Sequence, residues 1–237
     1  MQPTFLPWLG WFDIVDQSDV VVLLDDVSFS KQSWQQRNRI RTAQGLDIVS
    51  VPVKTAGRLG QPICEVEVAN PDFHVRVLGK ISMAYRRAPY FETYFHSFSE
   101  HLNLARRSGL LVDVNIELIS FLCESLGVAT PMVRSSGLGV QGRRGGKVAA
   151  LCEAVQATQY LSPAASQAYL LEDRSAFDVR GVSVELQVYE HPEYSQVFQP
   201  FEPYACALDL LFNEGPSSLR IIRQGRRTPR TLTNEER

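Results

Sequence analysis

MQPTFLPWLGWFDIVDQSDVVVLLDDVSFSKQSWQQRNRI, residues 1–40, is the stretch that decides the fold class of this chain of 237 residues. An aromatic, proline-bearing turn at residues 4–11 leads into a short segment, 7–17, whose apolar side chains lie near helical spacing. The apolar run Val20–Leu24 follows and stops at Asp25 and Asp26. A continuous β-branched run of this length is typical of a buried strand in a parallel sheet.

These residues indicate a strand–helix–strand beginning. Gln2 and Pro3 come directly after Met1, so if they lie at the end of a strand, that strand is nearly absent. A helix between two strands favours a parallel pair. We therefore expect an α/β fold with a mostly parallel, Rossmann-like sheet that is flanked by helices.

The rest of the chain continues this alternation. Strands are expected at 46–53, 63–68, 133–135, 158–162 and 182–189, and helices at 71–83, 90–107, 112–126, 147–157, 164–171 and 204–212. The helix at 112–126 has the clearest apolar stripe, and Gly127 follows it where a capping glycine belongs. We expect one α/β domain over 1–224, with a helical insert at about 71–126 and a flexible polar tail at 225–237.

Composition excludes several classes of protein. The net charge is -2, whereas nucleic-acid or membrane-surface binding needs a broad basic field. No apolar run is long enough for a membrane helix, and the N-terminus lacks the pattern of a signal peptide, so a cytoplasmic location is expected. The four cysteines and four histidines show no zinc spacing, so we expect reduced thiols and neither a metal nor a cofactor.

Polar side chains follow the run Val20–Leu24, where open α/β proteins build ligand sites. The pair Asp25 and Asp26 opens into a cationic, amide-rich segment at 31–41. This segment includes Lys31, Arg37 and Asn38. Such groups recognise carboxylate, phosphate or amide, and an acid beside them can bind a metal, orient an amine or act as a base. A solvated loop and a structural ion pair remain as alternatives.

A glycine-rich basic loop, GLGVQGRRGG at 137–146, precedes Lys147. It contains a G-x-G-x-x-G spacing, but the expected helix begins after the loop rather than inside it. Val148 stands where a Walker motif needs serine or threonine. A nucleotide fingerprint is therefore not supported. Arg143, Arg144 and Lys147 beside a helix N-terminus suit an anionic group, and an exposed mobile loop is the alternative.

Two later segments offer further candidates. The proline-punctuated loop 189–201 carries aromatic and amide side chains, among them Tyr194 and Gln196, and such a loop suits a binding lid. Tyr160 and Ser162 end a short predicted strand, again at the position of a site. No G-x-S-x-G elbow surrounds Ser162, so a hydrolase triad is not expected.

Four long blocks resemble the WbqC-like family of bacterial proteins. They are QPTFLPWLGWFD (2–13), DVVVLLDDVSFSKQSWQQRNRI (19–40), KVAALCEAVQATQYLSPAASQAYL (147–170) and YSQVFQPFEPYACALDLLFNEGP (194–216). The resemblance covers nearly the whole chain and keeps the order of the family's blocks.

The resemblance implies a small-molecule biosynthetic enzyme, of surface-polysaccharide or amino-acid pathways, that forms an amide by acyl or aminoacyl transfer to an amino sugar or amino acid. The expected catalytic residues are Asp25, Asp26, Lys31 and Asn38. The acids would orient or deprotonate the amine, Lys31 would hold an anionic donor, and Asn38 would stabilise the oxyanion. The expected substrate-binding residues are Gln2, Trp8, Arg37, Lys147, Tyr160, Ser162, Tyr194 and Gln196. The partners would be a small-molecule substrate and an acyl donor that a carrier can bear, with no nucleic acid and no membrane.

Two other functions remain open at this stage. The beginning of the chain is similar at fold level to nucleotidyl- or adenylyl-transferring enzymes with an H-x-G-H motif, although LPWLGWF holds Gly10 and no histidine pair. A non-catalytic carbohydrate-binding protein is the other alternative, because Trp8, Trp11 and Trp34 are suited to sugar stacking. No motif in the chain fixes the reaction type or the oligomeric state.

Overall fold

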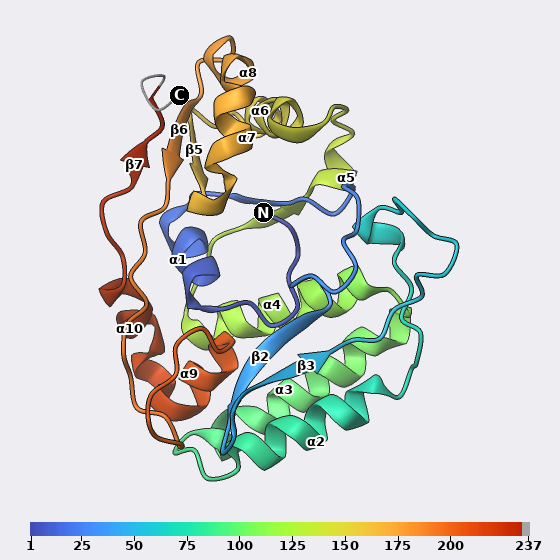
Figure 1. The fold of residues 1–237 in the computed structure, drawn as a ribbon, viewed down its shortest axis with the longest axis vertical. Helices are drawn as coiled ribbons and strands as arrows, with labels where there is room; N and C mark the ends of the chain where they lie inside the picture. Colours follow the sequence, from blue (N-terminus) through green and yellow to red (C-terminus); the bar gives the residue numbers. More distant parts are fainter. Residues whose placement is uncertain (234–237) are drawn as a thin grey trace.

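The structure is a computed structural model, and it describes residues 1–233. Its elements form two groups, with the N-terminus drawn between them (Figure 1). The α-helices are α1 (Leu9–Gln17), α2 (Phe73–Tyr85), α3 (Phe91–Ala105), α4 (Leu111–Leu126), α5 (Ser135–Leu138), α6 (Arg144–Ala154), α7 (Gln167–Glu172), α8 (Arg174–Asp178), α9 (Ala207–Glu214) and α10 (Ser218–Gln224). The strands are β1 (Val21–Leu23), β2 (Arg37–Thr42), β3 (Gly45–Ser50), β4 (Met132–Arg134), β5 (Gln159–Ser162), β6 (Ser183–Leu186) and β7 (Arg230–Thr231). Short 3₁₀ turns are η1 (Ile63–Glu65), η2 (Arg106–Ser108), η3 (Ala164–Ser166) and η4 (Gly215–Ser217).

The larger hydrophobic core joins α1 to α2, α3, α4, α9 and the β2–β3 hairpin, in the lower part of Figure 1. Phe12, Phe98 and Phe212 are fully buried in it. Aromatic residues at helical spacing in α2 and α3 therefore contribute to a core, because burial of large apolar surface is the main favourable term in folding. Of the helices in residues 1–233, none has the length and the apolar character to span a bilayer.

A smaller core lies among α6, α7, α8 and β6, in the upper part of Figure 1. Its centre includes Ala149, Leu170, Phe177 and Val184, which are all fully buried. Leu24, directly after β1, packs against this cluster from outside. The smaller core therefore meets the rest of the chain at the end of β1.

The strands form separate small sheets. β1 pairs parallel with β4, β5 pairs parallel with β6, β6 pairs antiparallel with β7, and β2 and β3 form an antiparallel hairpin. The expected α/β fold with parallel strand pairs is confirmed. One continuous Rossmann-like sheet is not formed by residues 1–233, because only Met1 bonds to the free edge of β1 and no strand connects β1 to β5.

Two local predictions were wrong. Residues 37–42, predicted as part of a polar loop, are β2, in which Asn38 and Ile40 point inward while Arg37 and Arg39 stay half-exposed. Because the polar Asn38 points inward, the sequence of β2 does not alternate between apolar and polar residues, which is the pattern that identifies a strand. Residues 63–68 were predicted as a strand. Their first three residues instead form the 3₁₀ turn η1, and Glu67 and Val68 each form only an isolated bridge.

The predicted flexible tail is also corrected for residues 225–233. Arg230–Thr231 adds to the edge of β6, and Leu232 is fully buried in the smaller core. The polar composition of this segment suggested fraying, but single apolar residues are enough to anchor a terminus. Residues 234–237, the rest of the predicted tail, lie outside the described residues.

An ion-pair cluster ties the end of the chain to α1. Asp13 is fully buried and accepts from Arg226 at 2.8 Å and from the amide of Gln187 at 2.7 Å. Asp16 accepts from Arg223 at 2.7 Å and also pairs with Arg226. Asp16 has a lowered pKa, mainly because Arg223 donates to it. The cluster therefore joins the first helix to residues about two hundred positions later.

Candidate functional site

The carboxyl ends of β1 and β4 meet at one place. The two strands are parallel and in register, with Leu23 opposite Arg134, so the residues that follow them lie side by side. After β1 come Asp25 and Asp26, and after β4 comes the start of α5, Ser135 and Ser136. This edge is where open α/β folds bind ligands.

Asp25 is a fully buried carboxylate with several donors. Its Oδ2 accepts from Arg134 Nε at 2.6 Å and from the Ser136 hydroxyl at 2.7 Å. Its Oδ1 accepts from the Ser136 backbone N–H at 2.9 Å. Burial raises the pKa of Asp25, but the bonds from Ser136 and Arg134 outweigh it, and the pKa lies below its usual value. Asp25 is therefore an ionised anchor for the start of α5.

Asp26 faces the solvent side of the same corner. Its Oδ2 lies 2.6 Å from Lys147 Nζ, and its Oδ1 accepts from the Ser135 hydroxyl. Ser135 Oγ also lies 3.2 Å from Asp25 Oδ1, so one buried hydroxyl is shared by both acids. The Asp26 side chain is 23% exposed and that of Lys147 is 9% exposed. Asp26 is therefore the acid that a molecule in solution can reach.

Asp26 and Lys147 belong to the wall of a cleft of about 840 Å³. The polar side chains that line it are Gln2, Asp26, Ser28, Arg143, Arg144, Lys147 and Tyr169. Gln2 is held by Gln35, whose amide donates to Gln2 Oε1 at 2.8 Å. Arg144 pairs with Glu172 at 3.0 Å on the surface. One acid among three cations makes this cleft suited to an anionic molecule that also carries an amine.

The first turn of α6 positions these cations. Gly142 has a φ of 134°, a conformation that side chains rarely adopt, and it turns the chain into the helix. The Gly145 N–H donates to Asp173 Oδ2 at 2.8 Å, which caps the helix start. Asp173 therefore fixes the start of the helix that carries Lys147 and directly follows Arg143.

Two neighbouring glycines provide a test of this packing. Gly145→Ala would place its Cβ 2.6 Å from Asp173 Cβ, so the cap must move, and we expect a loss of about 1–3 kcal/mol of stability. Gly146→Ala meets no atom within 4 Å and should gain about 0.5–1 kcal/mol from helix propensity. Urea unfolding of both variants measures the difference. Equal effects would show that the Asp173 cap does not fix α6.

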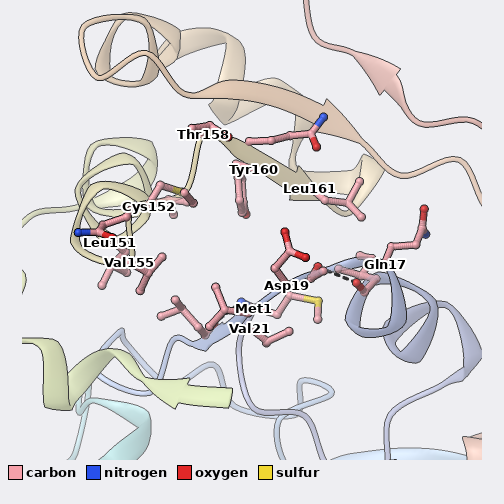
Figure 2. Close-up of a pocket in the computed structure, with 18 of the residues that line it drawn as sticks. Met1, Gln17, Asp19, Val21, Leu151, Cys152, Val155, Thr158, Tyr160 and Leu161 are labelled. Carbon is pink, nitrogen blue, oxygen red and sulfur yellow. Dashed lines mark hydrogen bonds between the residues drawn. The ribbon is translucent and has the colours of Figure 1, made fainter. Parts of the chain in front are cut away.

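Tyr160 and Ser162 lie at the end of β5, and Ser162 is buried. Tyr160 stacks on Phe177 with ring centroids 5.7 Å apart. Burial and the nearby Tyr169 hydroxyl raise the pKa of Tyr160 well above its usual value, although a hydrogen bond with Ser162 lowers it. Tyr169 lines the cleft, whereas Tyr160 and Ser162 do not. Tyr160 instead lines a second pocket, of about 310 Å³, between β1 and β5 (Figure 2).

Of the predicted site residues that follow Asp26 in the sequence, Lys31, Arg37 and Asn38 do not line the cleft. Lys31 is exposed. Asn38 is buried and donates both amide protons, to Phe5 O at 3.1 Å and Leu6 O at 2.8 Å. Arg37 is half-buried, with a buried Nε that has no partner among the described residues. Asn38 therefore holds the aromatic turn in place.

Trp8, Tyr194 and Gln196 lie in other surroundings. Trp8 stacks on His191 with ring centroids 6.2 Å apart, in a group of aromatic rings. Tyr194 and Gln196 both donate to the buried Asp209, at 2.6 and 2.8 Å. Burial raises the pKa of Asp209, against the bonds from these two residues. None of the three predicted residues lines the cleft.

Four residues of the site were missed from the sequence: Arg134, Ser135, Ser136 and Tyr169. Ser135 and Ser136 come directly after the short strand β4, much as Asp25 and Asp26 come after β1. The signal was therefore present, but the two strands are about 110 residues apart, and only their pairing shows that they share an edge.

Comparison with known proteins identifies relatives of this chain. The family model of the WbqC-like protein family matches residues 2–221. An uncharacterized protein of Mycobacterium tuberculosis, Rv1507c, is 30% identical over 234 residues, which are 94% of this chain and 97% of that protein. No solved structure matches the chain. The match to the family model extends from Gln2 through the cleft to α10, and the chain belongs to the WbqC-like protein family.

Proposed function

We propose that the cleft is the active site of a small-molecule biosynthetic enzyme that forms an amide by acyl or aminoacyl transfer to an amino sugar or amino acid. The observation that carries the proposal is the Asp26–Lys147 pair at 2.6 Å, in a cleft whose other cations are Arg143 and Arg144. An acid beside a cation can receive the amine, while the remaining cations hold an anionic donor.

Asp26 is the proposed base. Asp25 already accepts from Arg134 and Ser136 and is fully buried, so it holds the loop and does not meet the substrate. Asp26 would accept a hydrogen bond from the neutral amine of the acceptor and take one proton from the nitrogen as that nitrogen attacks the acyl carbon. The C–N bond forms, the bond to the leaving group breaks, and the proton passes from Asp26 to that group.

Lys147 is the proposed oxyanion stabiliser. Its ammonium is nearly buried beside Asp26, so it acts where the effective dielectric constant is low. Arg143 and Arg144 would bind an anionic group of the donor, such as the phosphate of a carrier. The side-chain amide of Gln2 would form a hydrogen bond with the amine substrate. The donor-binding role of Lys31 and the roles of Arg37, Tyr160 and Ser162 stay predictions, and Asn38 has no free amide proton for the role first assigned to it.

A thermal-shift screen tests the proposal. The compounds are acyl- and aminoacyl-thioesters, amino sugars, amino acids, and nucleotides with and without magnesium. A ligand at about 100 times its Kd should add about 2.7 kcal/mol, which is several degrees in a domain of this size. We expect a thioester and an amino compound to stabilise the protein, and stabilisation by nucleotide with magnesium alone would contradict acyl transfer.

Matched lysine variants make the screen specific. Lys147→Met should reduce the shift caused by the anionic donor, because it removes one of the three cations of the cleft. Lys80→Met is the control, since Lys80 pairs with Asp47 at 2.8 Å on the surface of α2 and β3. If both variants keep the shift, the donor binds elsewhere.

A further inference from the structure

The outer side of α2 carries apolar side chains that are not part of the core. The helix lies at the lower edge of the molecule (Figure 1), and its inner side, with Phe73 and Val77, is buried against α3 and the β2–β3 hairpin. On the outer side Val75 is 63% exposed and Met83 is 80% exposed. No other helix in residues 1–233 has two large apolar side chains exposed. Because the outer side of an amphipathic helix is normally polar, these two residues form an apolar strip that a second surface can cover.

Gly79 lies midway between Val75 and Met83. The three residues are four positions apart and therefore share one side of the helix. A Cβ at Gly79 would meet no atom within 4 Å, so packing within the chain does not require a glycine there. A glycine in a helix interior costs about 0.5–1 kcal/mol relative to alanine. Contact with a second helix gives this cost a physical reason, because two helix axes approach closely where no side chain separates them.

The charges at the two ends of α2 are placed symmetrically about Gly79. Asp72 precedes the first residue of the helix and Arg86 follows the last, so each lies seven positions from the glycine. Both side chains are exposed, and Asp72 makes no side-chain bond to the helix start. The ion pairs formed within residues 1–233 include neither of them. An acid and a base are therefore available at equal distances from Gly79.

We propose that the outer side of α2 is a contact surface between two copies of this chain, whose α2 helices pack antiparallel about a two-fold axis at Gly79. Such an axis brings each residue before Gly79 opposite the residue that lies the same number of positions after it. Val75 of one copy then contacts Met83 of the other. Asp72 of one copy meets Arg86 of the other, and symmetry makes each contact occur twice.

The charges favour this occupant and this direction. A parallel pair would place Asp72 beside Asp72 and Arg86 beside Arg86, and like charges repel. In the antiparallel pair the positive N-terminus of each helix lies beside the negative C-terminus of the other. The surface is therefore complementary to itself in charge and in the positions of its apolar residues, which favours a second copy over an unrelated protein.

The size of the contact sets the expected affinity. One helix pair buries less area than a standard protein interface, so we expect a weak dimer with a Kd of about 10–100 µM. The described residues that line the cleft of Asp26 and Lys147 lie on other elements than α2. The inference therefore concerns assembly and stands without the proposed reaction.

Sedimentation equilibrium of the natural chain and of charge variants tests the proposal. Between about 5 and about 500 µM, the average mass of the natural chain should rise from that of a monomer toward twice that value. Asp72→Arg and Arg86→Asp should each raise the dimer Kd by at least about tenfold, because each substitution creates two contacts between like charges. The variant with both substitutions should dimerise as the natural chain does, since the acid and the base have only exchanged places.

Arg220→Asp is the matched control, because it makes the same change of charge at an exposed position on α10. It should leave the Kd unchanged. A chain that stays monomeric at all concentrations would overturn the proposal. So would a dimer whose Kd responds equally to Arg86→Asp and Arg220→Asp, or a double variant that does not recover the natural Kd.

A cysteine at the proposed axis gives a second readout. In Gly79→Cys the thiols of the two copies meet, and mild oxidation should join them in a disulfide. In Val75→Cys the two thiols would lie roughly 12 Å apart along the helices, which is too far for this bond. Non-reducing electrophoresis compares both variants with the natural chain, in which the half-exposed Cys64 sets the background. Equal cross-linking of the two variants, or none above background in Gly79→Cys, would overturn the antiparallel arrangement.

Discussion

Replacing Asp25 with alanine is expected to lower the free energy of unfolding by about 3–5 kcal/mol, because several hydrogen bonds to a fully buried carboxylate are lost together. Arg134 and the hydroxyl and N–H of Ser136 would then lack their acceptor. Urea unfolding measures the loss. Asp113→Ala is the control, since Asp113 lies 3.3 Å from the same arginine at an exposed position and should cost less than about 1 kcal/mol. Similar losses for both variants would contradict the role of Asp25 as an anchor.

The same carboxylate predicts a pH dependence. The folded-state pKa of Asp25 is lowered relative to the unfolded chain, so its contribution to stability is complete above the unfolded value of about 4. The contribution is lost as the pH falls from about 4 through the lower folded-state value. Between about pH 6 and pH 3, the natural chain should therefore lose more stability than Asp25→Asn. Parallel curves for the two proteins would show that Asp25 gains no stabilisation on folding.

Asp26→Asn is expected to reduce turnover of the amine and acyl donor by about 10²–10⁴-fold, because asparagine cannot accept the proton. Its oxygen still accepts from Ser135 or Lys147, so stability should fall by no more than about 1–2 kcal/mol. Steady-state kinetics with the substrates found by thermal shift, beside a urea titration, separate the two effects. A loss of turnover below about tenfold would exclude Asp26 as the base.

Asp25 and Asp26 could be predicted as site residues from the sequence because the pattern that indicates them is local. Val20–Leu24 reads as a buried strand, and Asp25 and Asp26 stand at its end. Their partners Ser135 and Ser136 could not be predicted with equal ease, since no short-range pattern shows that β1 pairs with β4. Lys147 was found as a cation at the start of a helix, but its pairing with Asp26 depends on the same long-range contacts.

Other residues show why a polar side chain is a weak indication of a ligand site. Asn38 faces inward on β2, where its amide satisfies two backbone carbonyls, so a polar residue occupies a core position. Tyr194 and Gln196 surround the buried Asp209 and serve a structural network, although their loop resembled a lid. The spacing of apolar residues in the sequence does not show which polar residues are buried with their hydrogen bonds satisfied. Such residues are therefore easily taken for ligand contacts.

The pairing of Asp13 with Arg226 also has a consequence for synthesis. Arg226 is made 213 residues after Asp13. A ribosome that adds about 5–20 residues per second needs roughly ten to forty seconds for this interval. During that time the first helix carries two acids, Asp13 and Asp16, without their arginine partners. A nascent chain that stalls before Arg226 therefore keeps an incompletely neutralised helix, and closure of the fold is delayed until Arg226 has been made.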